Sequence, residues 1–148
     1  MLKGGKILLY DLSVCTIKEW IADIKLYPSK IVLTLHNFSV LPGSENKLLK
    51  GLELGCDGII TATCNITATL ARKVYDDFIQ NKDQSENEKL CKVRTIFDGY
   101  NLISAIHSLM TQIDKSYSNI LPPLSLLNKK DCQKLIEELK KIDFNYKN

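Results

Sequence analysis

Short apolar runs alternate with segments of helical periodicity in the first half of the chain, and this alternation limits the possible folds more than any other feature. The apolar runs lie at residues 6–10, 31–35, 38–41 and 57–63. Their length is typical of strands, and the first and last of them are apolar enough to be buried on both faces of a sheet. A helical pattern follows the runs that end at residues 10, 41 and 63. Strands that alternate with helices predict an α/β fold with a parallel sheet and right-handed crossovers.

Local signals mark the ends of these helices. Thr16 and Glu19 form a capping box at the start of the first helix. Ser44 can cap the second helix, and Gly55 can end it in the left-handed conformation. The third helix begins after Asn65 and carries its apolar residues on one stripe, namely Ile66, Leu70, Val74 and Phe78.

The connection between the second and third apolar runs is too short for a crossover. Only His36 and Asn37 separate residues 31–35 from residues 38–41. A parallel crossover needs about a dozen residues or more. These runs could therefore be one bent strand, a hairpin, or two strands whose connection is missing.

The second half of the chain is helical in character. A polar loop is expected at residues 80–88, and amphipathic helical patterns continue from there to the C-terminus. Pro122 and Pro123 separate the last helix from its predecessor, and Asn128 can cap it.

Composition and charge exclude several classes of protein. A chain with 45% hydrophobic and 25% charged residues is not a disordered or fibrous protein. Its formal charge of +3 is small and scattered, so we expect no nucleic-acid partner. No apolar run approaches the roughly 18 residues of a membrane span, and the N-terminal run lacks a cleavage site. We therefore expect a cytoplasmic location and no membrane partner.

Cysteine and histidine residues do not form a recognisable metal or redox motif. The 5 cysteines include no C-x-x-C pair and lie in or beside apolar stretches, which is typical of reduced core thiols. His36 and His107 have no partner at ligand spacing. We expect neither a metal nor a cofactor.

Two stretches carry a family resemblance. They read FSVLPGSE at residues 38–45 and LLKGLELGCDGIITATCN at residues 48–65. They resemble the seventh strand, the turn after it, the seventh helix and the eighth strand of the dihydrodipicolinate synthase and N-acetylneuraminate lyase family, which also contains the 2-keto-3-deoxygluconate aldolases. Residues 6–10 resemble the fifth strand of this family, and residues 121–124 resemble its proline-rich link before the last helix.

The resemblance implies part of a (β/α)8 TIM barrel followed by a C-terminal helical extension. A complete barrel needs about 250 residues, whereas this chain has 148. The matching strands are those that resemble the fifth to the eighth, and the sixth helix is missing. We expect one domain, in which residues 1–80 form the partial barrel and residues 81–148 form the extension packed on it.

The same resemblance suggests site residues for Schiff-base chemistry on pyruvate or another 2-keto acid. Tyr10 matches a tyrosine that relays protons, and Gly43, Ser44 and the backbone carbonyl of Ile60 match substrate-binding positions. From the residues alone, these could equally be a packed strand-end tyrosine, a turn glycine, an N-cap serine and a core isoleucine. Asn65 is either a turn residue or the edge of the pocket.

The lysine that forms the Schiff base in the family has no counterpart. When residues 30–35 are aligned with the sixth strand, Leu35 occupies its position. A leucine has no amine to condense with a carbonyl, and Lys30 lies at the wrong end of the strand for barrel chemistry. We therefore predict a member of the class I aldolase/lyase family that is inactive as an isolated chain, with Tyr10 vestigial. The alternative is a non-enzymatic interaction module or remnant that associates with itself or with a full-length relative.

Overall fold

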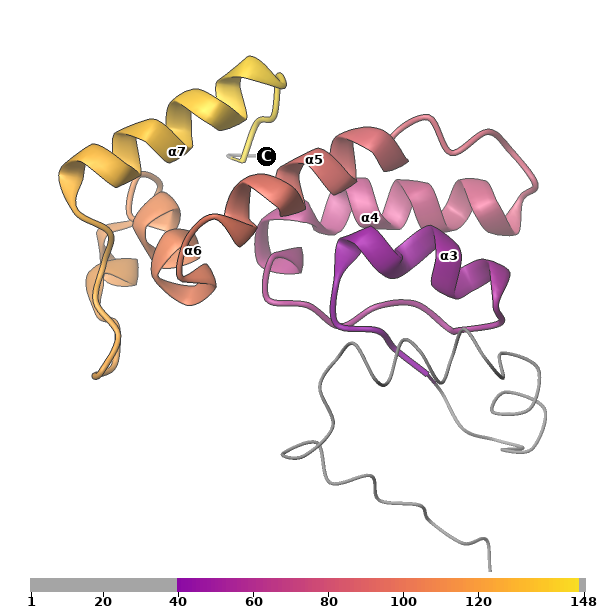
Figure 1. Ribbon diagram of the computed structural model, residues 1–148, viewed down its shortest axis with the longest axis horizontal. Helices are drawn as coiled ribbons and strands as arrows, with labels where there is room; N and C mark the ends of the chain where they lie inside the picture. Colours follow the sequence, from indigo (N-terminus) through magenta and orange to yellow (C-terminus); the bar gives the residue numbers. More distant parts are fainter. Residues whose placement is uncertain (1–39, 147–148) are drawn as a thin grey trace, which may run out of the picture. The chain divides into compact units, whose positions relative to one another are not determined.

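Helices account for most of residues 40–146, which are the residues that the computed structural model describes (Figure 1). The expected strands at residues 6–10 and 31–35, and the helix expected after Thr16, lie outside this range. The described residues belong to one compact unit, Ser39–Asn148. In chain order its elements are η1 (Glu45–Lys47), α3 (Leu48–Glu53), α4 (Cys64–Ile79), α5 (Asn87–Asp98), α6 (Leu102–Met110), η2 (Lys115–Ser118) and α7 (Lys129–Lys141).

Helix α5 contributes to two apolar cores. Its Leu90 packs in the first core with residues of α3 and α4, namely Leu48, Leu52, Ala71 and Val74. Its Val93 and Phe97 pack in the second core with residues of α6 and α7, namely Ala105, Ile106, Leu109, Leu135 and Leu139. Figure 1 accordingly shows α5 between the α3–α4 pair and the α6–α7 pair. One face of each of α4, α5, α6 and α7 is buried. In the stripe predicted for α4, Val74 is buried, whereas Ile66, Leu70 and Phe78 are half-buried.

The predicted helix ends had different outcomes. Gly55, with φ 84°, follows α3 in the left-handed conformation as expected. Asn128 caps α7, because its side chain accepts a hydrogen bond of 2.9 Å from the Asp131 N–H. Ser44 takes the extended backbone conformation of an N-cap before η1, but its side chain makes no capping hydrogen bond. The side-chain cap expected at Ser44 is therefore wrong.

The buried strand expected at residues 57–63 is also wrong. Within residues 40–146 no strand forms, and this stretch is an extended segment. Two hydrogen bonds join it to the end of the preceding apolar run: the Asp57 N–H donates to the Val40 carbonyl at 3.1 Å, and the Ile60 N–H donates to the Pro42 carbonyl at 3.2 Å. The two segments therefore run side by side in parallel without forming a regular ladder.

Gly58 explains why the ladder stops. In a regular parallel pair, both chains advance by two residues between such bonds. Here the donor side advances from Asp57 to Ile60 while the acceptor side advances only from Val40 to Pro42. Gly58 takes up the extra residue with φ 152°, a conformation that side chains rarely adopt. The strand character of the α/β class is thus absent from the described residues, in which the regular elements are helices.

Helices α4 and α5 lie on either side of the expected boundary at residues 80–81, and they share the core around Leu90.

None of the helices in the described part of the chain is both long and apolar enough to cross a lipid bilayer.

Candidate functional site

The turn at Gly43 lies beside the extended segment that contains Ile60. A Cβ atom added to Gly43 would lie 3.7 Å from the Ile60 carbonyl oxygen. The Ile60 N–H is bonded to the Pro42 carbonyl next to this turn. The structure therefore places the Gly43–Ser44 turn beside Ile60, which comes from a separate stretch of sequence. We call this backbone feature the Gly43–Ile60 edge.

The other predicted positions had separate outcomes. Tyr10 and Leu35 lie outside the described residues. Asn65 lies in the first turn of helix α4 and not in a loop turn, and its side-chain amide donates to the Ala62 carbonyl at 2.8 Å. It lines a cavity whose lining does not include Gly43 or Ile60. Ile60 is not a core residue, since 70% of it is exposed.

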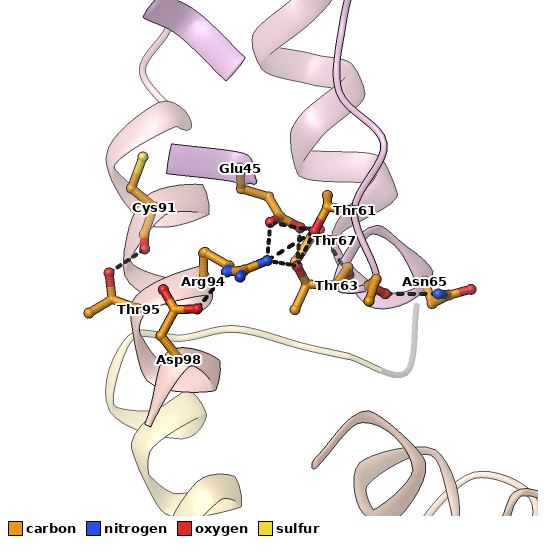
Figure 2. Close-up of polar contacts among 10 residues, drawn as sticks. Glu45, Thr61, Thr63, Asn65, Thr67, Cys91, Arg94, Thr95 and Asp98 are labelled. Atoms are coloured by element: carbon orange, nitrogen blue, oxygen red, sulfur yellow. Dashed lines mark hydrogen bonds and ion pairs between the residues drawn. The ribbon is translucent and has the colours of Figure 1, made fainter. Parts of the chain in front are cut away.

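A buried carboxylate follows directly after Ser44. Glu45 is completely buried and accepts hydrogen bonds from the hydroxyl groups of Thr61 at 3.1 Å, Thr67 at 2.9 Å and Thr63 (Figure 2). Arg94 of α5 approaches the same carboxylate, with Nη1 3.5 Å from Oε2. We call these five residues the Glu45 cluster.

Arg94 connects this cluster to helix α5. Its Nη1 lies 3.0 Å from the Thr61 hydroxyl oxygen, and its Nε donates to Asp98 at 2.8 Å. A buried carboxylate is tolerated only when it is paired and hydrogen-bonded. No buried side-chain polar atom in the described part of the chain lacks a partner. The cluster therefore links Glu45, which follows the Gly43–Ser44 turn, to Thr61, which follows Ile60, and so stabilises the Gly43–Ile60 edge.

The Glu45 cluster was missed by sequence reasoning. Glu45 and Arg94 are 49 positions apart, so no local spacing relates them. An acidic residue in the first turn of a helix is ordinarily explained by the helix dipole. The sequence signal that could have indicated the cluster is the spacing of Thr61, Thr63 and Thr67. Residues two apart on an extended segment share one side, and a residue in the first turn of the following helix can lie near them. Their hydroxyl groups can therefore donate to one acceptor.

Few nucleophiles are available near the site. Burial raises the pKa of the Cys56 and Cys64 thiols, which lowers the thiolate fraction on which their reactivity depends. Burial and the charge of Arg94 lower the pKa of the Lys47 amine, in η1 just after the cluster's Glu45. No group of three or more potential metal-ligating side chains occurs among the residues described.

The comparisons with known proteins agree with this architecture. The family model for the dihydrodipicolinate synthetase family matches residues 8–142. A solved structure of a monomeric dihydrodipicolinate synthase variant is similar, with a TM-score of 0.70 and 16% identity over 84% of this chain. The N-acetylneuraminate lyase of Proteus mirabilis is similar with a TM-score of 0.68 and 17% identity over 83% of this chain. No curated protein matches the sequence.

The chain spans less than half of each solved structure, 42% of the first and 43% of the second. Both structures are TIM-barrel enzymes, and the chain covers part of each. The expected resemblance to the family is therefore confirmed, whereas the partial barrel stays a prediction. Since the family model covers residues 8–142 of 148, the chain belongs to the dihydrodipicolinate synthetase family.

Proposed function

We propose that this chain carries the keto-acid-binding backbone of a pyruvate-dependent class I aldolase/lyase but lacks the lysine for the covalent step. The observation that supports this proposal is the Gly43–Ile60 edge. Gly43, which has no Cβ, lies beside the backbone carbonyl of Ile60, a residue that is 70% exposed, and no donor among residues 40–146 is bonded to that oxygen. Pyruvate or another 2-keto acid is the proposed ligand.

The covalent step explains why the isolated chain should be inactive. A class I aldolase uses a lysine amine to attack the ketone carbonyl, and loss of water gives the Schiff base from which a carbon–carbon bond is made or broken. The resemblance places Leu35 at that lysine, so this position offers no amine. Tyr10 would then have no covalent intermediate to protonate. The proposal includes a partial barrel at residues 1–80 and a helical extension at residues 81–148. It also includes a cytoplasmic location.

Borohydride trapping tests the missing covalent step. The full chain is incubated with pyruvate and sodium borohydride, and its intact mass is measured. We expect the mass to stay unchanged. A pyruvyl adduct on any lysine would contradict the proposal. Peptide mapping would then identify the modified lysine. Lys47, whose pKa is lowered, is the candidate to form the Schiff base in place of the missing lysine. Lys47→Arg should then abolish the adduct, and Lys50→Arg, at an exposed lysine, is the matched control.

Keto-acid binding needs a separate measurement. In an amide NMR titration of the full chain with pyruvate, we expect saturable shifts at Gly43 and Ile60 and no shift at Gly99, which ends α5. Absence of saturable shifts at the Gly43–Ile60 edge would contradict binding there, whatever the trapping experiment gives.

The second candidate function is an interaction module. Leu41 and Ile60 lie on the two paired extended segments and are 39% and 70% exposed. Apolar side chains next to unpaired backbone favour association through an edge. We expect concentration-dependent association in sedimentation that Ile60→Ser weakens. The control is Ile79→Ser, because Ile79 is 57% exposed at the end of α4. A monomer at all concentrations would contradict this function.

A further inference from the structure

A cavity of about 210 Å³ lies between the start of α4 and helix α6, apart from the Gly43–Ile60 edge. Ile103, Ile106 and Met110 of α6 form an apolar wall. Asn65, His107 and Tyr117 contribute polar groups to the lining. Ile106 is 7% exposed, whereas Ile103 and Tyr117 are each 40% exposed, so the cavity has a buried floor and an open mouth.

The hydrogen bonds already made in the cavity wall determine which groups remain for a ligand. The Nδ1 atom of His107 lies 2.8 Å from the Tyr117 carbonyl oxygen. A carbonyl can only accept, so Nδ1 carries the proton and Nε2 of the neutral ring is an acceptor. The Asn65 amide nitrogen donates to the Ala62 carbonyl, which leaves the Asn65 side-chain oxygen as a second acceptor.

An anionic ligand does not fit this wall. The cavity lining contains no lysine or arginine. The first backbone N–H groups of α4 donate to carbonyls of residues 61–63 at 2.9 to 3.3 Å, so they are not available to a carboxylate or phosphate. The groups left for a ligand are the acceptors on His107 and Asn65, together with the Tyr117 hydroxyl and the second amide N–H of Asn65. They favour a ligand with a hydroxyl group, which can both donate and accept a hydrogen bond.

We propose that this cavity binds a small uncharged molecule that combines an apolar body with one or two hydroxyl groups. A dry cavity of about 150 Å³ already accommodates benzene in another protein, so a single ring with a hydroxyl group fits the size. The apolar body packs on Ile103, Ile106 and Met110, and the hydroxyl donates to His107 or Asn65. A keto acid is an anion, so this site is distinct from the one in the proposed function.

Phenol is the probe, and the full chain is used. In an amide NMR titration we expect saturable shifts around Asn65, Ile103 and His107. Anisole, which has the same ring but no donor, should bind about tenfold more weakly. Benzoate should cause no saturable shift. Ile103→Trp should abolish phenol binding by filling the mouth, whereas Ile113→Trp, at an exposed position beyond α6, should leave it unchanged.

Three results would overturn the proposal: no saturable shift with phenol, equal affinity for phenol and anisole, or unchanged phenol binding in Ile103→Trp. If Ile103→Trp does not fold, His107→Phe replaces it. This variant keeps a ring but removes the acceptor, so phenol affinity should fall about tenfold while anisole affinity stays the same. Equal effects on both ligands would contradict the assigned role of His107. Pyruvate shifts at Gly43 test the proposed function independently.

Discussion

Arg94 of α5 lies 3.5 Å from the carboxylate of Glu45, although the two residues are 49 positions apart. Their side chains are 14% and 0% exposed, so the pair lies largely out of water. Glu45 follows the Gly43–Ser44 turn, and α5 contributes to both apolar cores. This contact therefore makes the geometry of the Gly43–Ile60 edge depend on the correct packing of α5.

Arg94→Met tests this dependence. The substitution leaves the Glu45 carboxylate buried with threonine hydroxyl groups as its remaining partners. Removing one partner of a buried ion pair costs about 3 kcal/mol or more, because the other charge stays desolvated. We expect a loss of this size in the free energy of unfolding, measured by urea denaturation followed by circular dichroism.

The control for this substitution is Arg72→Met. Arg72 also pairs with a carboxylate, that of Asp76 at 2.7 Å, but its side chain is 71% exposed on α4. Exposed pairs contribute little, so we expect the midpoint of unfolding to stay nearly unchanged. Equal losses in the two variants would show that the Glu45 cluster has no special role in stability.

Local pattern was sufficient to predict the helices but not the site. The stripe of Ile66, Leu70 and Val74 predicts α4, because helical neighbours three and four residues apart must share a buried face. The apolar run at residues 57–63 predicts a strand, but a ladder also depends on the partner and on the conformation of Gly58. The Glu45–Arg94 contact depends on tertiary packing, which no short sequence window contains.

Gly58→Ala tests the explanation for the interrupted ladder. Gly58 has φ 152°, so an alanine must either adopt a strained backbone or change the path between Asp57 and Ile60. Such strain costs about 1–3 kcal/mol, and we expect a loss of that size in urea denaturation. Gly99→Ala is the control, because Gly99 has φ −76° and accepts a side chain without backbone strain. A loss confined to Gly99→Ala would contradict this account.

Alanine substitutions at the N-cap positions Asn128 and Ser44 should lower the free energy of unfolding by different amounts. Asn128→Ala removes the acceptor for the Asp131 N–H at the start of α7 and should cost about 1 kcal/mol. Ser44→Ala removes no capping bond and should cost less than about 0.5 kcal/mol. Thermal unfolding of both variants by calorimetry measures the difference. A larger loss for Ser44→Ala would mean that its hydroxyl makes a cap in solution.

Tyr100 should make stability fall at high pH. Burial, and then the hydrogen bond of 3.1 Å to Glu138, raise the pKa of Tyr100 from 10.0 to about 12. The folded chain therefore holds this proton more tightly than the unfolded chain does. The resulting stabilisation is fully present below pH 10 and is lost as the pH rises toward 12.

A spectroscopic titration of tyrosinate absorbance measures this shift directly. Subtracting the curve of Tyr100→Phe from that of the unmodified chain isolates the ionisation of Tyr100, and we expect its midpoint near pH 12. Glu138→Gln removes the charge but leaves the burial, which is the larger cause. The midpoint should therefore move only partly back toward the ordinary value. A difference curve centred at pH 10 in the folded chain would contradict the contact between Tyr100 and Glu138, and with it the docking of α7 beside the end of α5.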